Sequence, residues 1–346
     1  MKYENIQIGR GVAALVVAFH HLLLPQLQMV FPHSILFQVL HFNYMGDFAV
    51  YFFFCISGFV MILSCTERPK SAKDFIFDRI IRIYPLYITF TLISLITFRY
   101  TRGDWSWLIN LNYYPKDIGE IISSLTLFPP LTNSERFAMP LASAWSLVYE
   151  MFFYILFAFL LFFFKIKYLP HVLLIIFTSL FLIINLAFEP VRGRWVHWPY
   201  VISDLINLCF AIGGLLYFAP KWIPNKKWVP GILITVMLLV LMLLPEFYHS
   251  KITLMVFAIL VFYLVLSLTY TDNSLGRILC YLGNASYSIY LTHIVFNSLS
   301  WYAIKISWIA GLSLFLAAII FGCLVYHFVE RPIARFFKKK MASRQS

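Results

Sequence analysis

Charged residues are scarce in this chain of 346 residues. Asp, Glu, Lys and Arg make up 12% of the sequence, against about 25% in a typical soluble domain, whereas hydrophobic residues make up 61%. Negative charge is the scarcer sign, because 15 Asp and Glu stand against 27 Lys and Arg, which gives a formal net charge of +12. This composition all but excludes a water-soluble globular protein. The positive surplus must first be tested against membrane topology.

Cysteine is also sparse and scattered. Most of the cysteines lie within apolar runs, none forms a C-x-x-C pair, and none clusters with histidine; the five are Cys55, Cys65, Cys209, Cys280 and Cys323. They fit small buried apolar residues, which excludes a disulfide framework and a zinc site, and we expect no metal. The sequence also lacks internal repeats, low-complexity tracts and long linkers. We therefore expect one membrane domain over residues 1–346, with no extra soluble domain.

Long apolar runs, by contrast, are abundant. A membrane-spanning helix needs about 20 predominantly apolar residues. The segments that qualify are 8–28, 46–65, 82–98, 143–164, 169–188, 200–219, 229–245, 252–270, 285–303 and 307–329. The first run has charged or polar residues at both ends and no cleavage site after it, so we interpret it as a retained helix rather than a signal peptide. The sequence thus predicts an all-α, polytopic integral membrane protein with about ten transmembrane helices.

The distribution of positive charge predicts the orientation of these helices. An even number of spans places both termini on the same side of the membrane. If both termini are cytoplasmic, most of the 27 Lys and Arg residues fall in cytoplasmic segments, as the positive-inside rule requires. The positive surplus is then explained by topology, and we expect no nucleic-acid partner.

The first predicted span carries two polar residues on one face. Arg10 and His21 are eleven residues apart, and eleven steps of 100° return to within about 20° of the same direction with a rise of about 16 Å. His20 points about 100° away from this stripe. One face of the helix therefore carries a cation near the cytoplasmic edge and an imidazole deep in the membrane. Ionisable residues inside a membrane are costly, which makes both of them functional candidates.

Two further segments bring charge to the same region. Arg79 and Arg82 are at i and i+3, so they share a helical face at the start of the third predicted span, where they suit a phosphate group. The positive-inside rule alone also predicts cations there. Glu150 in the fourth span falls at about the depth of His21, about 10 Å below the outer boundary. We predict a cationic cytoplasmic layer and a deeper layer that contains His21 and Glu150.

Several other polar residues are weaker candidates. Asn284, Ser286 and His293 lie at the start of the ninth span and part way along it, where contacts between helices explain such residues equally well. Trp105 and Trp107 lie in an outward-facing loop, and Trp145 opens the fourth span. Tryptophans of this kind either stack on a sugar or belong to the interfacial aromatic belt.

Six short motifs follow one another along these spans. They are Arg10-Gly11-x-Ala13-Ala14 with His21, Phe53-Phe54-x-x-Ser57-Gly58-Phe59, Arg79-x-x-Arg82-Ile83-Tyr84-Pro85, Trp145-Ser146-Leu147-x-x-Glu150-x-x-Phe153-Tyr154, Ser286-Tyr287-x-x-Tyr290-Leu291-x-His293, and Glu330-x-Pro332. In this order the sequence resembles the bacterial acyltransferase family 3 of integral membrane O-acyltransferases over nearly its whole length. It departs from the family at Ala49-Val50-Tyr51, where Gly-Val-Asp is frequent.

The resemblance implies transfer of an acyl group, most often acetyl, from cytoplasmic acetyl-CoA to a hydroxyl of a carbohydrate. The acceptor would be a cell-surface, periplasmic or lipid-linked glycan, and the enzyme would lie in the bacterial inner membrane. The essential histidine of the family maps to His21, which would act as general base or as nucleophile. Glu150 would orient His21 or bind the acceptor. Donor-binding residues would be Arg10, Arg79, Arg82, Asn284 and Ser286, and weaker acceptor candidates Trp105, Trp107, Trp145 and His293.

Two alternatives stay open at the level of sequence. A secondary transporter or lipid flippase would use the buried ionisable residues as a proton relay, although no repeat relates the two halves of the chain. A nearer alternative keeps the acyltransferase and changes its acceptor to peptidoglycan, a small lipid or an antibiotic. The sequence does not determine the oligomeric state.

Overall fold

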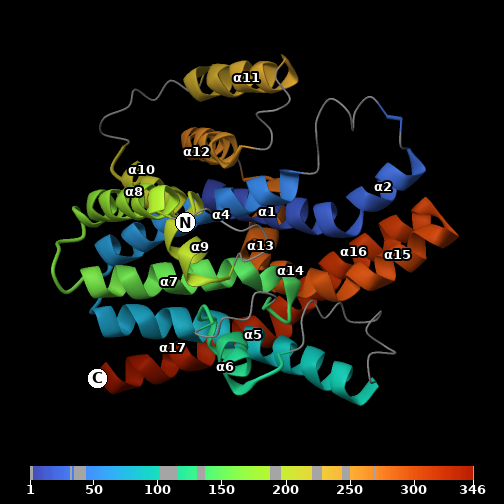
Figure 1. Cartoon of the computed structure of the whole chain (residues 1–346), viewed down its shortest axis with the longest axis horizontal. Helices are drawn as coiled ribbons and strands as arrows, with labels where there is room; N and C mark the ends of the chain where they lie inside the picture. The colour runs from blue at the N-terminus through green and yellow to red at the C-terminus, as the bar shows by residue number, and fades with distance from the viewer. Residues whose placement is uncertain are drawn as a thin grey trace.

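The computed structural model describes residues 3–31, 33–34, 44–101, 115–130, 137–187, 196–219, 228–243, 250–268, 270 and 272–345. Over these residues the chain is helical and contains no β-sheet, which confirms the predicted all-α class. Most of the long helices run along one common direction, and α11 lies outermost, beyond α12 (Figure 1). The first and last helices begin and end in the same half of this view, so both termini lie toward one end of the bundle.

The helices of the first half of the chain are α1 (Glu4–Leu22), α2 (Leu24–Val30), α4 (Met45–Glu67), α5 (Ala72–Thr101), α6 (Ile118–Thr126), the 3₁₀ turn η2 (Ala142–Ala144), α7 (Trp145–Leu160), α8 (Leu169–Ala187), α9 (Trp198–Ser203) and α10 (Ile206–Leu216). Those of the second half are α11 (Trp228–Leu243), α12 (Lys251–Ser267), α13 (Ser274–Asn284), α14 (Ser286–Thr292), the 3₁₀ turn η5 (His293–Phe296), α15 (Asn297–Ile306), α16 (Trp308–Val325), the π-helical turn η6 (Tyr326–Glu330) and α17 (Arg331–Gln345).

Five helical segments in the described residues are long and apolar enough to cross a membrane. They are Met45–Glu67, Ala142–Leu160, Leu169–Ala187, Trp198–Leu216 and Trp308–Phe337. Counting α1 and α2 as one broken span gives a sixth. Helices also occupy the other predicted segments, but they are shorter, broken or more polar. The chain therefore has the character of a membrane protein, while ten spans and cytoplasmic termini stay predictions.

Two predicted spans are interrupted by the backbone. The first bends by 46° between α1 and α2, where Pro25 stands at the start of the second helix. Proline lacks the backbone N–H that would continue the ladder, so the break at this position follows from the sequence. The predicted span 285–303 is divided into α14, η5 and α15, and the break begins at His293. Both breaks lie beside the histidines of the candidate site.

The third predicted span begins earlier than the apolar run suggested. Helix α5 starts at Ala72 instead of residue 82 and is 30 residues long, with Pro85 inside it. Arg79 and Arg82 therefore lie about 10 and 15 Å along the helix from its first residue, rather than at its start. Their position at the cytoplasmic surface stays a prediction. The charged first turns kept this part of the helix out of a search for apolar runs.

Glycines allow the helices around the site to approach closely. Gly58 on α4 faces the backbone of α10, and Gly213 on α10 faces the backbone of α4, so a Cβ at either position would collide with a carbonyl group. Gly11 on α1 and Gly283 on α13 form a second crossing of this kind. Small residues at such crossings are the usual means by which membrane helices pack. Helix α4 thus lies centrally, against α1, α10 and α12.

Candidate functional site

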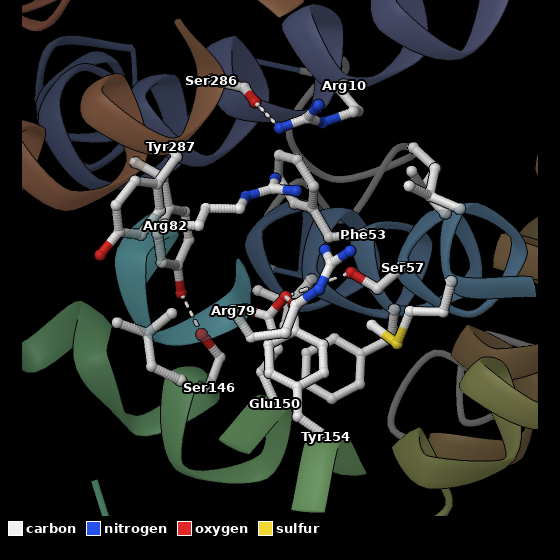
Figure 2. Close-up of a pocket in the computed structure, with 17 residues that line it drawn as sticks. Arg10, Phe53, Ser57, Arg79, Arg82, Ser146, Glu150, Tyr154, Ser286 and Tyr287 are labelled. Carbon is white, nitrogen blue, oxygen red and sulfur yellow. Dashed lines mark hydrogen bonds between the residues drawn. The ribbon is translucent and has the colours of Figure 1, made fainter. Parts of the chain in front are cut away.

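Four of the predicted donor-binding residues line one pocket, the three arginines and Ser286. Arg10 from α1 and Arg79 and Arg82 from α5 surround a cavity of about 70 Å³ between α1, α4, α5, α7 and α14. Their guanidinium groups converge on the middle of this arginine pocket (Figure 2). Arg10 is more than 60 residues from the other two in sequence, so helix packing alone brings them together.

Arg10 is held in place by two hydrogen bonds. Its Nη2 atom donates to Oγ of Ser286 at 2.9 Å, and its Nη1 atom donates to Oε1 of Gln7 at 3.1 Å. Ser286 is the first residue of α14 and is buried. The predicted donor-binding residue Ser286 therefore orients Arg10 and also lines the arginine pocket.

Arg79 is supported by aromatic rings. Its guanidinium carbon lies 5.2 Å from the ring centre of Phe75 and 5.6 Å from that of Tyr154. The residue is buried, and its Nε atom has no hydrogen-bond partner in the part of the chain that the structure describes. Cation–π contacts stabilise the charge without using its N–H donors. The Nε–H donor of Arg79 therefore stays available for an anion.

The arginine pocket adjoins a larger cavity of about 660 Å³, which shares all three arginines. The further charged or polar residues that line the larger cavity are Arg68, Lys70, Asp74, Asp78, Asn284 and Glu330. Lys70 forms an ion pair with Asp78. The predicted residue Asn284 thus lies in the outer, larger cavity and Ser286 in the inner one. Together the two cavities form a continuous cationic cleft.

Glu330 reaches this cleft from a π-helical turn. The turn η6 joins α16 to α17, and π-helical turns occur frequently at functional sites. The carboxylate of Glu330 accepts a hydrogen bond from Ser288 on α14. Ser286, on the same short helix, accepts a hydrogen bond from Arg10. Two serines of α14 therefore position one cation and one anion of the cleft.

Glu150 lies in the arginine pocket. Its Oε1 atom accepts hydrogen bonds from Oγ of Ser57, at 3.3 Å, and from the hydroxyl of Tyr154. Glu150 was predicted to share a deeper layer with His21. In the structure it lines the same pocket as the three arginines, and His21 is not among the residues that line this pocket.

The histidines form a separate group beyond the arginine pocket. The rings of His21 and His293 stack with their centroids 5.4 Å apart and 23° between their planes. The ring of His20 meets that of His21 edge-on at 4.9 Å. His293 is fully buried, and its Nδ1 atom lies 3.2 Å from the carbonyl oxygen of Ile289. His293 was predicted as a weak acceptor-binding residue, whereas it lies directly against the predicted catalytic histidine.

Tyr290 lies between the arginine pocket and the histidines. Its ring lines the pocket. The centre of this ring lies 6.1 Å from the ring centre of Phe53 and 5.9 Å from that of His293. The hydroxyl donates to the carbonyl oxygen of Ser143 at 2.9 Å and shares a 2.7 Å hydrogen bond with Ser146. Sequence reasoning gave Tyr290 and Ser146 no role, although both belong to the motifs that carried the family resemblance.

The predicted tryptophans have different outcomes. Trp145 is half-buried and meets Tyr149 edge-on at 5.8 Å, and it does not line the arginine pocket. Trp105 and Trp107 lie outside the described residues. All five cysteines are free thiols, and in the described ranges no group of three His, Cys, Asp or Glu side chains is arranged to hold a metal ion.

Comparison with known proteins identifies the class of this chain. The acyltransferase domain of acyltransferase family 3 matches residues 3–327, so the chain belongs to that family. It is 30% identical over 325 residues to the exopolysaccharide production protein ExoZ of Rhizobium meliloti (strain 1021), a match that covers 85% of this chain and 91% of ExoZ. No solved structure matches the chain. The protein is a membrane acyltransferase, which confirms the resemblance found in the motifs.

Proposed function

We propose that this protein is an O-acetyltransferase that moves acetyl from cytoplasmic acetyl-CoA to a hydroxyl of a cell-surface or lipid-linked carbohydrate. The observation that carries the proposal is the convergence of Arg10, Arg79 and Arg82 in one pocket. Arg10 lies on α1, the helix that also carries His21. Membership in an acyltransferase family favours this function over a transporter or flippase.

The cleft suits a donor with a phosphorylated end and a long neutral arm. The phosphates of CoA would bind to the guanidinium groups, which offer paired N–H donors to phosphate oxygens. The nucleotide part would occupy the 660 Å³ cavity, near Arg68, Lys70 and Asn284. The pantetheine arm would pass through the arginine pocket toward the histidines. Arg10 and His21 share one helix, and the rise between them is about 16 Å, which sets the reach of the arm.

His21 would perform the chemistry at the end of this path. It would remove the proton of the acceptor hydroxyl, or attack the thioester and carry the acyl group transiently. Glu150 would act in the donor pocket, where its negative charge offsets part of the charge of the arginines. The acceptor would approach from the opposite side of the membrane, where Trp105, Trp107 and Trp145 are candidate sugar contacts.

The name of the relative supports a polysaccharide acceptor, because ExoZ is described as an exopolysaccharide production protein. Capsule, O-antigen and lipid-linked intermediates are chemically equivalent acceptors, since each presents sugar hydroxyls. We place the enzyme in the inner membrane of a bacterium with cytoplasmic termini, because this orientation puts the cationic cleft on the side where acetyl-CoA is present. The positive-inside distribution supports it.

A direct test uses purified protein in detergent, acetyl-CoA labelled in the acetyl group, and alkali-deacetylated extracellular polysaccharide from the producing cells. We expect label in the polysaccharide together with release of CoA thiol, and neither from His21→Ala. His171→Ala is the matched control, because His171 is exposed on α8. Absence of transfer to any glycan, peptidoglycan or lipid fraction from the wild-type protein would refute the proposal. Full activity of His21→Ala would refute the assigned residue.

A further inference from the structure

His293 carries a buried nitrogen that nothing else in the described structure uses. The side chain is fully buried, and its Nε2 atom has no hydrogen-bond partner among the described residues. Burying an unpaired polar atom is energetically unfavourable, so such atoms are rare unless a ligand or a reaction engages them. The second ring nitrogen, by contrast, is fixed by the backbone.

The hydrogen bond to the backbone determines the state of the free nitrogen. Nδ1 of His293 lies 3.2 Å from the carbonyl oxygen of Ile289, and a carbonyl oxygen only accepts. The proton of the neutral ring is therefore on Nδ1, and Nε2 presents a bare lone pair. A histidine whose second nitrogen is held in this way has the arrangement of a general base.

The position of the His293 ring relates it to the predicted catalytic histidine, His21. The rings of His293 and His21 stack with centroids 5.4 Å apart and 23° between their planes. The break between α14 and η5 falls at His293, so the ring is presented where the regular helix ends. His293 thus lies next to His21, where it can act on a molecule that reacts there.

Resting on the proposed function, we infer that the two histidines divide the reaction: His21 accepts the acyl group as nucleophile, and Nε2 of His293 removes the proton of the sugar hydroxyl. His293 is then a catalytic residue for the second half of the transfer. This assigns the nucleophilic route to His21 and gives the acceptor hydroxyl its own base.

The atoms and charges of this scheme balance. In the first step a neutral His21 nitrogen attacks the thioester carbonyl, the C–S bond breaks, and CoA leaves as thiolate from a cationic acyl-His21. In the second step the acceptor oxygen attacks the acyl carbon, Nε2 of His293 takes its proton, and the C–N bond to His21 breaks. Ester and neutral His21 result, and cationic His293 passes its proton through solvent to the thiolate. Only one of the two stacked rings is charged at a time, which avoids repulsion between adjacent cations.

The test separates the two steps. Exchange of labelled CoA into acetyl-CoA, measured without acceptor, reports the first step, and transfer of labelled acetyl to alkali-deacetylated polysaccharide reports both. The variants are His293→Asn, whose amide N–H can replace Nδ1 in the bond to Ile289, and His293→Gln as a second variant with a different shape. His171→Asn applies the same substitution at an exposed site. Elution of each variant as a single species from a size-exclusion column, and a thermal unfolding temperature close to that of the wild type, confirm that the variants are folded.

We expect both His293 variants to keep CoA exchange within about threefold of wild type and to lose transfer by about 10²–10⁴-fold, the usual contribution of a general base. His21→Ala is expected to lose both activities. The inference is overturned if His293→Asn transfers at the wild-type rate, if exchange and transfer fall together in both folded variants, or if the wild type transfers acetyl without CoA exchange. A wild type that does neither refutes the proposed function instead.

Discussion

Nη2 of Arg10 on α1 donates a 2.9 Å hydrogen bond to Ser286, which is 276 positions further along the chain at the start of α14. Gly11 and Gly283 bring α1 and α13 together directly beside this contact. The cationic cleft therefore exists only when the N-terminal helix has packed against the last third of the chain. Its preorganisation is a property of the whole fold.

Ser286→Ala should weaken donor binding without stopping catalysis. A hydrogen bond that involves a charged group contributes about 1.5–3 kcal/mol, and Arg10 keeps its second bond to Gln7. We expect the KM for acetyl-CoA to rise about tenfold with kcat within about twofold. Steady-state kinetics with Ser286→Thr, which retains the hydroxyl, provides the control. A fall in kcat at unchanged KM would contradict the assignment of this pair to the donor.

The ring of Tyr154 makes a cation–π contact with Arg79, and its hydroxyl donates a hydrogen bond to Glu150. Tyr154→Phe keeps the cation–π contact and removes the hydrogen bond, whereas Tyr154→Ala removes both. A partly desolvated cation–π contact contributes about 0.5–2 kcal/mol. We expect the KM for acetyl-CoA to rise by a further factor of about 2–30 from the Phe to the Ala variant. Equal KM values for the two variants would show that the ring does not position Arg79.

Glu330 places a negative charge among the arginines of the cleft, so Glu330→Gln should strengthen donor binding rather than weaken it. The amide can still accept from Ser288, but it no longer offsets the positive charge. We expect tighter binding of CoA, a lower KM for acetyl-CoA, and a steeper loss of affinity as ionic strength rises. Isothermal titration with CoA at two salt concentrations measures this. A higher Kd would indicate that Glu330 has only a structural role.

Gly58 tests the close crossing of α4 and α10. A Cβ at this position would collide with the carbonyl group of Phe210, and the collision involves backbone that cannot move aside. Overpacking of this kind costs about 1–3 kcal/mol or more, so Gly58→Ala should lower the thermal unfolding temperature in detergent by several degrees. Gly231→Ala on α11 is the matched control, because a Cβ at that position would meet none of the described residues within 4 Å. A Gly58→Ala protein as stable as the control would contradict the described crossing.

The sequence singled out the arginines that line the arginine pocket, because they belong to short local patterns. Arg79 and Arg82 share a helical face at i and i+3, and Arg10 and His21 share a stripe at i and i+11. Such relationships depend only on helix periodicity. The position of Glu150 beside the three arginines could not be predicted in this way, because it depends on how α7 packs against α1 and α5.

The sequence by itself determined that this protein lies in a membrane, that it is helical, and which family it belongs to. A chain with 61% hydrophobic residues has to satisfy its backbone hydrogen bonds within helices once it lies in a membrane, and the order of its motifs defines the acyltransferase class. The tertiary structure alone decided which side chains meet across helices: Arg10 with Ser286, Glu150 with Ser57 in the arginine pocket, and His21 stacked on His293. These contacts depend on helix breaks and on glycine crossings, which fix the rotation and relative height of each helix, and neither quantity is encoded in the periodicity of any single segment.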